Sequence, residues 1–361
     1  MKLGLLVKVR TGKLDANAAV SGGCYPFFTC SKEVSEIDTY AYDCECVLVA
    51  GNGDLNVKYY NGKFNAYQRT YIVERASSEI NMRYLYHFLS CYVDVLRRQS
   101  IGGVIKYIKL GNLTEADIKL PDKETQERIS MILDRITHLI SLRQRQAEKL
   151  DELVKARFVE MFGDPVLNCQ GFPVRTIGEL TTEVKYGTSK PAVEGGKYPY
   201  LRMNNLTIDG KLDLHDLKQI DVDTSEFEKC VVRKGDVLFN RTNSAELVGK
   251  TAYYGLDEEM IIAGYIIRVR VNNLILPQYL SFYMNMPFMK QRIRSMAKGA
   301  VNQANINSKE LKSIKVIVPP LEVQGKVVEY EERIDREKDR IQRSAALLET
   351  LKRSLMQQYF G

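Results

Sequence analysis

Side chains suited to reading base edges recur in short polar segments of the second half of the chain. One segment holds Arg202, Asn204 and Asn205, and another holds Arg241 and Asn243 directly after a predicted strand. Asn can form paired hydrogen bonds with adenine, and Arg with guanine, while Lys more often holds phosphates. The pattern predicts DNA contacts, with these candidates: Lys185, Lys190, Arg202, Asn204, Asn205, Arg241, Asn243, Lys298 and Asn302.

The first half of the chain holds a comparable but more basic set of loop residues. Any one of them could equally be a solvated side chain, or an Asn that serves turn geometry. The prediction therefore rests on the set and not on a single member. Its members are Lys13, Lys32, Asn52, Lys58, Arg69 and Lys106.

Residues for catalysis are not arranged in a recognisable constellation. His87, His138 and His215 lack metal-ligand spacing, and no GxxxxGK[ST] phosphate loop or Asn-Pro-Pro-aromatic methyl-transfer tetrad is present. The Glu-x-Lys endings at 183–185 and 310–312 resemble part of a nuclease motif but have no upstream acidic partner in a strand. We expect a chain without metal, cofactor or activity of its own.

The composition is that of a globular protein with a basic bias. The net charge is +7 over 361 residues. Residues 123–163 hold 8 basic and 7 acidic side chains, and residues 321–361 hold 8 of each, so about +6 lies outside these segments. Basic globular regions suit a polyanion. The chain has no 18-residue apolar run, no secretory leader and seven Cys without framework spacing, which predicts a cytoplasmic protein with reduced thiols.

An internal repeat organises the elements that must position these residues. Residues 112–163 align without a gap with residues 310–361, at an offset of 198, and both copies end in Phe-Gly. The repeat is too long for a solenoid unit. It predicts two domains, 1–121 and 164–319, each followed by a long helix, 122–163 and 320–361.

Both long segments show heptad spacing of apolar residues. Their matching length and register predict an antiparallel coiled coil around a pseudo-two-fold axis, and two helices packed separately on their own domains are the alternative. Each helix would span ~57 Å. The expected seams are Ile129, Ile132, Ile136, Leu139, Leu150 and Leu153 in the first helix, and Val327, Tyr330, Ile334, Ile341, Leu348, Leu351 and Leu355 in the second.

Landmarks within the two domains also correspond. Residues 185–190 resemble 8–13, residues 195–200 resemble 22–27, and residues 235–240 match 44–49. Helical spacing is predicted over 81–98 and again over 278–294. The order of mixed strands and helices is typical of an α+β fold.

At this point the chain resembles the specificity subunit of type I restriction–modification systems, over essentially its whole length. The resemblance is carried by the tandem domain–helix order, the Leu-Pro and Val-Pro-Pro helix entries at 120–121 and 318–320, and Gln126 and Gln324. Gly-Asp-Val-Leu at 235–238 and the Phe-Gly endings agree with it.

The resemblance implies that each target-recognition domain reads one half of a bipartite double-stranded DNA sequence, with the coiled coil setting the spacer. It also implies docking of two modification subunits that methylate adenine with S-adenosylmethionine, and of restriction subunits that use ATP and Mg, all in phage defence. Two other classes remain: an enzyme with a hidden nuclease or methyltransferase site, and a coiled-coil scaffold that binds no DNA.

One departure concerns the start of the first domain. Residues 164–175 have no counterpart before Met1, so the first domain is expected either to lack a leading strand or to differ only in linker.

Overall fold

The chain, described here as a computed structural model, forms two compact units. The structure describes residues 1–163, 168–300 and 303–361, with the side chains of residues 298–303 outside that description. Unit 1 contains residues 1–147 and 340–361, and unit 2 contains residues 148–339. Each unit is described separately below.

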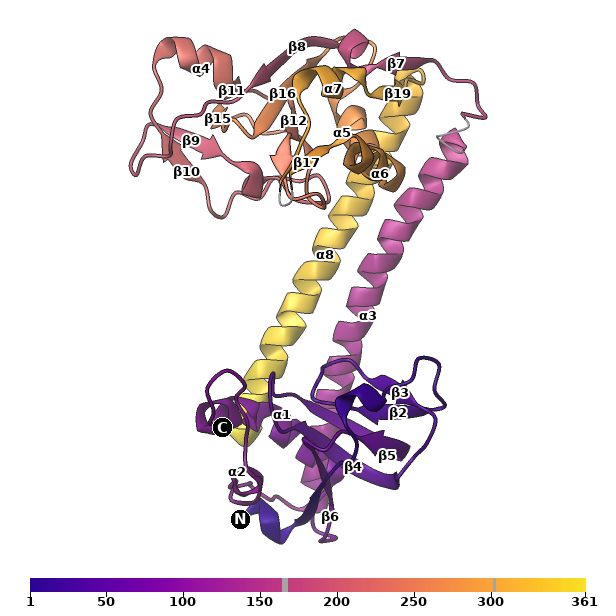
Figure 1. Ribbon diagram of the computed structural model, residues 1–361, viewed down its shortest axis with the longest axis vertical. Coiled ribbons are helices and arrows are strands. Elements are labelled where there is room, and N and C mark those ends of the chain that lie inside the picture. The colour runs from indigo at the N-terminus through magenta and orange to yellow at the C-terminus, as the bar shows by residue number, and fades with distance from the viewer. Residues whose placement is uncertain (164–167, 301–302) are drawn as a thin grey trace. The chain divides into compact units, whose positions relative to one another are not determined.

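Unit 1 contains the first domain, the beginning of helix α3 and the end of helix α8 (Figure 1). Its elements are η1 (Leu3–Leu5), β1 (Val7–Thr11), η2 (Ala16–Ala18), β2 (Tyr25–Phe28), β3 (Ser35–Ile37), β4 (Tyr42–Ala50), β5 (Val57–Ala66), β6 (Thr70–Arg75), α1 (Met82–Gln99), α2 (Leu110–Thr114) and α3 (Lys123–Phe162).

A six-stranded sheet, in the order β1-β6-β4-β5-β2-β3, is the scaffold of unit 1. Its pairs are antiparallel except β2 with β5. Strand β4 is apolar and buried from Cys46 to Ala50, as expected for a central strand. Helix α1 begins at Asn81, whose side chain accepts hydrogen bonds from the first turn, and packs its apolar face against β4 and β5. The helix predicted over 81–98 is confirmed.

Unit 2 contains the second domain with the end of α3 and the beginning of α8. Its elements are β7 (Val174–Thr176), η3 (Ile177–Leu180), β8 (Thr181–Tyr186), β9 (Tyr198–Leu201), η4 (Met203–Asn205), β10 (Lys218–Ile220), α4 (Thr224–Cys230), β11 (Val231–Val232), β12 (Val237–Asn240), β13 (Thr242–Asn243), β14 (Thr251–Tyr253), β15 (Met260–Ile262), β16 (Ile266–Val271), α5 (Pro277–Asn285), α6 (Pro287–Met296), β17 (Lys298–Ala300), β18 (Gln303–Asn305), α7 (Ser308–Ser313), β19 (Lys315–Ile317) and α8 (Leu321–Phe360).

The strands of unit 2 form several small sheets around β12. The order β14-β12-β16-β8 makes the central sheet, and β10-β9-β15-β11 makes a second one. A three-stranded sheet, β13-β18-β17, follows from the end of β12, and β19 pairs with β7. All four residues of β12 are buried, which agrees with the apolar side chains at its first three positions, Val237, Leu238 and Phe239.

The two domains repeat the same strand register, and the structure corrects the alignment within them. Val47 faces Val73 across β4 and β6 as Val237 faces Val269 across β12 and β16, so residue 47 corresponds to 237. Residues 235–240 therefore match 45–50, one residue from the predicted alignment. Segment 185–190 matches 10–15 and not 8–13, because the ladder of β8 with β16 fixes it.

The predicted helix over 278–294 is wrong as one helix, because it is broken into α5 and α6 at Pro287. Met286 is extended, with φ −61° and ψ 144°, and ends α5. Pro has no N–H to donate to the preceding turn and disfavours helical backbone in the residue before it. Pro287 is instead the first residue of α6, where its missing N–H costs nothing.

The leading strand of the second domain is β7, whose Thr176 faces Lys315. In the first domain the corresponding contact is the single bridge between Lys2 and Asp117. Of the two alternatives left open by the sequence, a missing leading strand or a difference in linker, the first is closer, because one bridge stands where the second domain has a paired strand. No helix in the described ranges is long and apolar enough to cross a bilayer.

The long helices pair antiparallel, as seen within each unit by itself. In unit 1, Ile129 and Leu133 near the start of α3 share a core with Leu355 and Phe360 near the end of α8. In unit 2, residues 158 and 162 near the end of α3 share a core with residues near the start of α8. The predicted antiparallel pairing of two long helices is confirmed, with α3 over Lys123–Phe162 and α8 over Leu321–Phe360.

Part of the predicted seam lies on the outside. The side chains of Ile132 and Leu139 are each 36% exposed, whereas Leu133 and Ile140, one residue later, are buried. Ile129 and Ile136 of the predicted seam are buried, so the buried stripe keeps these two positions and contains residues 133 and 140 in place of 132 and 139. The reason is that α3 packs on the first domain as well as on α8. Leu153 and Leu351 are also exposed, while Val327, Ile334 and Ile341 are buried as expected.

Candidate nucleic-acid interface

The structure gathers the predicted residues of the first domain around one loop, residues 51–56 between β4 and β5. Lys32 forms a 2.9 Å ion pair with Asp54 of this loop. Lys58 donates to the Ser31 carbonyl at 2.6 Å, which joins the loop after β2 to β5. Backbone hydrogen bonds hold two more candidates, Arg69 and Lys106, at this loop. The Gly51 N–H donates to the Arg69 carbonyl at 2.8 Å, and the Gly53 N–H donates to the Lys106 carbonyl at 2.9 Å.

Lys13 lies beside this group because β1 ends next to the turn that contains Arg69. The Gly12 N–H donates to the Thr70 carbonyl at 3.1 Å, and the Lys13 N–H donates to the Ala66 carbonyl at 3.2 Å. Lys13, Lys32, Arg69 and Lys106 are exposed. We call Lys13, Lys32, Asn52, Lys58, Arg69 and Lys106 the first-domain cluster. Six candidates that are far apart in sequence therefore share one end of the sheet.

Lys58 differs from the other members of the first-domain cluster. It is half-buried, and burial lowers the pKa of its ammonium group. The group is held by the Ser31 carbonyl and the Asn56 side chain. Lys58 therefore fastens the loop after β2 to the loop after β4, which orients its exposed neighbours.

In the second domain, the sheet β13-β18-β17 brings two predicted segments together. Thr242 faces Asn305 and Asn243 faces Ala304, while Lys298 faces Asn305 on the other side of β18. Strands β13, β17 and β18 thus form one ribbon. The side chain of Lys298 and the whole of Asn302, both predicted, lie outside the described part of the chain.

Arg241 lies where β12 passes into this ribbon. Its guanidinium carbon is 5.0 Å from the centre of the Tyr186 ring, a cation–π distance. Its Nε is buried and has no hydrogen-bond partner among the described residues. The ring of Tyr186 therefore holds the guanidinium group in place at the start of the ribbon. The neighbouring Asn243 donates to the Asn240 side chain at 2.9 Å.

The ribbon and the first-domain cluster occupy the same position in the duplicated fold. In both domains, the residue after the central strand (β4 or β12) donates its N–H to the residue just before the strand that pairs with it (β6 or β16). Its carbonyl accepts from the N–H of the residue directly after Tyr107 or Asn305. The hydrogen-bonded pairs are Gly51 to Arg69 and Ile108 to Gly51 in the first domain, and Arg241 to Tyr265 and Ile306 to Arg241 in the second. Asn52 bridges Tyr107 just as Thr242 faces Asn305.

Glycine is required at one turn in each copy of this site. A Cβ on Gly12 would lie 2.2 Å from the Ala66 carbonyl oxygen, and a Cβ on Gly187 would lie 2.2 Å from that of Ile262. Both distances are far below van der Waals contact. The close approach of β1 and β8 to the neighbouring turn is therefore the same in the two domains.

The remaining basic candidates of the second domain have acidic partners within the protein. Lys185 pairs with Glu183 at 2.6 Å, and Arg202 pairs with Asp216 at 2.9 Å. Lys190 pairs with Asp223 and Glu226, of which the hydrogen bond with Glu226 is the larger cause of its raised pKa. A phosphate would have to replace these carboxylates.

Asn204 and Asn205, although adjacent, differ in exposure. Asn204 is exposed in η4. Asn205 is 3% exposed; its side chain accepts from the Arg202 N–H at 2.9 Å and donates to the Asp213 carbonyl at 2.8 Å. In this conformation Asn205 stabilises its loop and does not face outward.

Sequence reasoning missed the aromatic side chains of this region. Tyr186 stacks on Arg241, and its hydroxyl accepts from the Ser308 N–H at 2.8 Å. Tyr265, which corresponds to Arg69, is 49% exposed. The sequence shows both tyrosines next to a strand end, with Tyr186 at the end of β8 and Tyr265 just before β16. Their proximity to Arg241 depends on the order of the strands in the sheet.

The two Glu-x-Lys segments have structural roles. Glu183 pairs with Arg268 and Arg270, and Asp236 joins the same group of charges. Glu310 accepts from the Asn307 N–H at 2.9 Å as part of a capping box of α7. Within the described ranges, no group of three or more His, Cys, Asp or Glu has the arrangement of a metal site.

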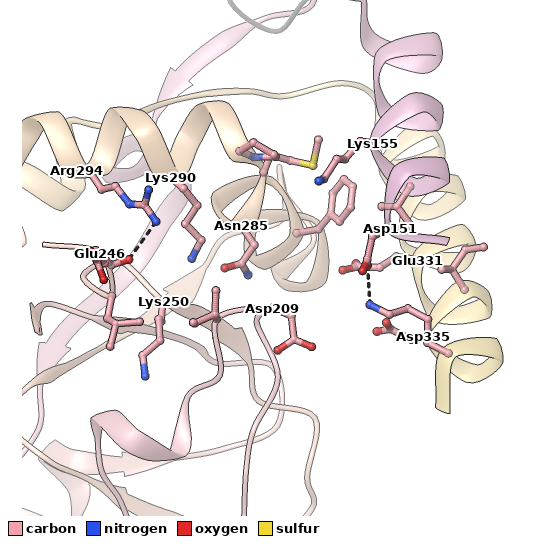
Figure 2. A pocket seen from close by; sticks show the side chains of 18 of the residues that line it. Asp151, Lys155, Asp209, Glu246, Lys250, Asn285, Lys290, Arg294, Glu331 and Asp335 are labelled. Carbon is pink, nitrogen blue, oxygen red and sulfur yellow. Dashed lines mark hydrogen bonds and ion pairs between the residues drawn. The ribbon is translucent and has the colours of Figure 1, made fainter. Parts of the chain in front are cut away.

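Unit 2 also contains a cavity of about 670 Å³, lined by α6 on one side and by α3 and α8 on the other (Figure 2). Figure 2 shows Lys290 and Arg294 on the α6 side and Glu331 and Asp335 on the α8 side. None of the predicted DNA-binding residues lines it. Burial lowers the pKa of Lys290 to about 8 and raises the pKa of Glu331 to about 8.

Comparisons with known proteins agree on one family. The sequence profile described as "Type I restriction modification DNA specificity domain" matches residues 1–152 and 171–352. The EcoDI type I restriction enzyme specificity subunit of Escherichia coli is 38% identical over 192 residues, which cover 53% of this chain and 40% of that protein. A putative type I specificity subunit of Haemophilus influenzae is 23% identical, covering 87% of this chain and 81% of that one.

Solved structures share the fold. The type I restriction–modification S subunit of M. genitalium matches with a TM-score of 0.63 and 17% identity, covering 100% of this chain and 95% of that chain. The chain spans less than half the length of the EcoDI subunit and of a putative specificity subunit, MjaX, of Methanocaldococcus jannaschii.

Proposed function

The chain belongs to the type I restriction–modification DNA specificity family, and from this premise we propose that it selects a bipartite double-stranded DNA sequence. In this proposal each target-recognition domain reads one half-site. The two long helices hold the domains apart and so set the length of the unread spacer. The chain itself performs no catalysis.

One observation supports this proposal more than any other. The duplicated fold carries a polar and basic loop site at the same position in both domains, and the two sites differ in their side chains. Where the first domain has Gly51 and Arg69, the second has Arg241 and Tyr265. A common scaffold with different side chains at the site is what two different half-sites require.

The partners follow from the same proposal. The chain would dock two modification subunits, which bring S-adenosylmethionine and methylate adenine. Restriction subunits with ATP and Mg would join them in the cytoplasm. Exposed apolar side chains on the long helices support a protein-binding role, since a helix that faced only water would be polar there. They include Met131, Leu142 and Val159 on α3 and Leu347 on α8.

Adenine-methylation mapping by long-read sequencing tests the proposal. The chain and its neighbouring modification subunit would be expressed in a host that lacks its own methylation. We expect one methylated motif with two specific parts and a spacer of constant length. Omitting this chain should abolish the methylation, which is the control for activity of the modification subunit alone.

Two results would contradict the proposal in different ways. A contiguous motif without a spacer would remove the bipartite reading. An absence of methylation with both proteins soluble and associated would mean that the chain assembles without reading DNA. If the proteins also failed to associate, the scaffold alternative would take its place.

A further inference from the structure

The most exposed apolar side chain among the described residues lies at the tip of a hairpin in the first domain. The side chain of Val104 is 103% exposed, that of Ile105 is 63% exposed and that of Ile101 is 43% exposed. Nothing in unit 1 covers them. Adjacent apolar side chains left fully in water indicate a surface that a ligand covers.

The hairpin is held in one shape by its backbone. Ile101 and Tyr107 exchange hydrogen bonds of 3.0 and 2.9 Å. Gly102 has φ +115°, and a Cβ there would lie 2.6 Å from the Ile105 carbonyl oxygen, so the turn needs glycine. Tyr107 also bridges Asn52, which joins the hairpin to the first-domain cluster. The apolar tip is therefore carried by a loop that one residue pair, Ile101 with Tyr107, closes.

The surroundings of the tip favour DNA over a protein partner. The exposed Lys106 is next to it in sequence, and its carbonyl holds Gly53, beside the Lys32–Asp54 pair. Three apolar side chains are far less than the ~800 Å² per partner that a stable protein interface buries. A narrow apolar tip beside the exposed Lys106 is instead suited to a groove lined with phosphates.

We propose that Val104 and Ile105 contact thymine 5-methyl groups in the major groove of the half-site read by the first domain. The inference rests on the proposed function and adds the base feature that is read. The major groove is wide enough for a two-stranded ribbon and so for a narrow loop of this kind, and thymine alone among the DNA bases places a methyl group there for apolar contact. The corresponding segment of the second domain, residues 298–305, contains Lys, Asn and Gln in its sequence and is suited to a different readout.

The test uses the chain in complex with its modification subunit and duplexes that carry the mapped motif. Each thymine of the first half-site is replaced singly by uracil, which removes only the methyl group. At one or two positions we expect binding to weaken about three- to tenfold, the size expected from loss of one buried methyl. Uracil in the second half-site is the matched control on DNA.

Variants assign the effect to the hairpin. The double variant Val104→Ala, Ile105→Ala should bind the thymine duplex more weakly and lose its sensitivity to uracil. Leu5→Ala, which shortens an apolar side chain that is 72% exposed outside the first-domain cluster, should keep that sensitivity. Circular dichroism and co-purification with the modification subunit check that the double variant is folded and assembled.

Failure of this inference is distinguishable from failure of the proposed function. If all uracil duplexes bind as the thymine duplex does, while scrambling the first half-site abolishes binding, the methyl readout is wrong and bipartite recognition stands. Uracil sensitivity that persists in the double variant would also overturn it. If binding is unchanged when either half-site is scrambled, the proposed function itself is refuted.

Discussion

At the scale of single residues, Arg241 is the side chain best placed to read a base in the second domain. It is held over Tyr186 at the point where β12 leads into the ribbon. We predict that Arg241→Lys will weaken binding to the cognate second half-site about tenfold or more, since lysine cannot reproduce a bidentate contact. Binding titrations of duplexes with each half-site altered in turn measure this.

The control for Arg241→Lys is Arg233→Lys, because Arg233 is paired with Glu259 and lies outside the ribbon. It should leave the affinity for both half-sites unchanged. An equal loss on cognate and unrelated DNA in Arg241→Lys would assign Arg241 to a phosphate, and base reading by Arg241 would be refuted.

A second prediction at the residue scale concerns pH. Burial first, and Asp335 next, raise the pKa of Glu331 from 4.5 to about 8, against the attraction of Lys211. A raised carboxyl pKa means that the folded state keeps a proton that the unfolded state releases. The contribution of Glu331 to stability is therefore complete below pH 4.5 and is lost as pH rises toward 8.

Glu331→Gln should remove this dependence. We expect the variant to gain stability over the native chain as pH rises from 5 to 7, by about 1–2 kcal/mol. Lys290, whose lowered pKa is about 8, stays charged over this range in both states and does not interfere. Thermal unfolding at several pH values measures the difference, with the exposed Glu332→Gln as control. A difference that is the same at pH 5 and pH 7 would contradict the assignment.

The sequence predicted which residue types would gather, but not the role of each. Asn205 has an amide side chain of the kind that can hydrogen-bond to a base, yet it is buried in its own turn. Lys190 and Arg202 are basic, but their acidic partners, Glu226 and Asp216, come from segments that the sequence does not mark as neighbours. Lys185 pairs with Glu183, two residues earlier on the same strand. Tyr186 was missed because an aromatic residue at a strand end becomes relevant only when the sheet order places Arg241 beside it.

At the scale of elements, one buried glutamine anchors the start of each long helix. Gln324 accepts from the Leu276 N–H at 2.8 Å and donates to the carbonyls of Leu274 and Pro319 at 3.1 and 2.8 Å. Gln126 makes the equivalent three contacts in unit 1. The repeat made both glutamines visible in the sequence, but their function as anchors is evident only from the structure.

Gln324→Met keeps the volume and removes every one of these hydrogen bonds. Each buried backbone group left without a partner costs about 1–3 kcal/mol. We therefore predict a loss of about 3 kcal/mol or more in the free energy of unfolding of unit 2, measured by urea titration. Gln342→Met, at an exposed position of the same helix, should cost little. Equal effects of the two substitutions would contradict the anchoring role.

The elements also show where periodicity predicts well and where it does not. The bounds of α3 and α8 follow from helix signals that act locally. The buried face of α3 could not be predicted from such signals. Leu133 packs into the core of the first domain and is buried, whereas Ile132 is exposed. A heptad pattern identifies a helix with an apolar face, but a second packing partner shifts which residues that face contains.

At the scale of the whole molecule, the proposed ruler makes a quantitative prediction. Seven residues would be inserted into each long helix, between Ala147 and Glu148 and between Asp339 and Arg340, where the two units divide. Seven residues add about 10 Å of helix, which is about three base pairs at ~3.4 Å each. Methylation mapping should then give the same two half-sites with a spacer longer by about three base pairs.

A five-residue insertion in both helices is the matched control. It adds a comparable length but turns the apolar seam by about 140°, whereas seven residues turn it by only about 20°. The shorter insertion should therefore abolish methylation through loss of helix pairing. In the proposal, side chains of the two domains select the bases and the helices set only the spacer length. A change in either half-site sequence after the seven-residue insertion would therefore contradict it. An unchanged spacer in an active complex would contradict it as directly, since the helices would then not determine the separation of the half-sites.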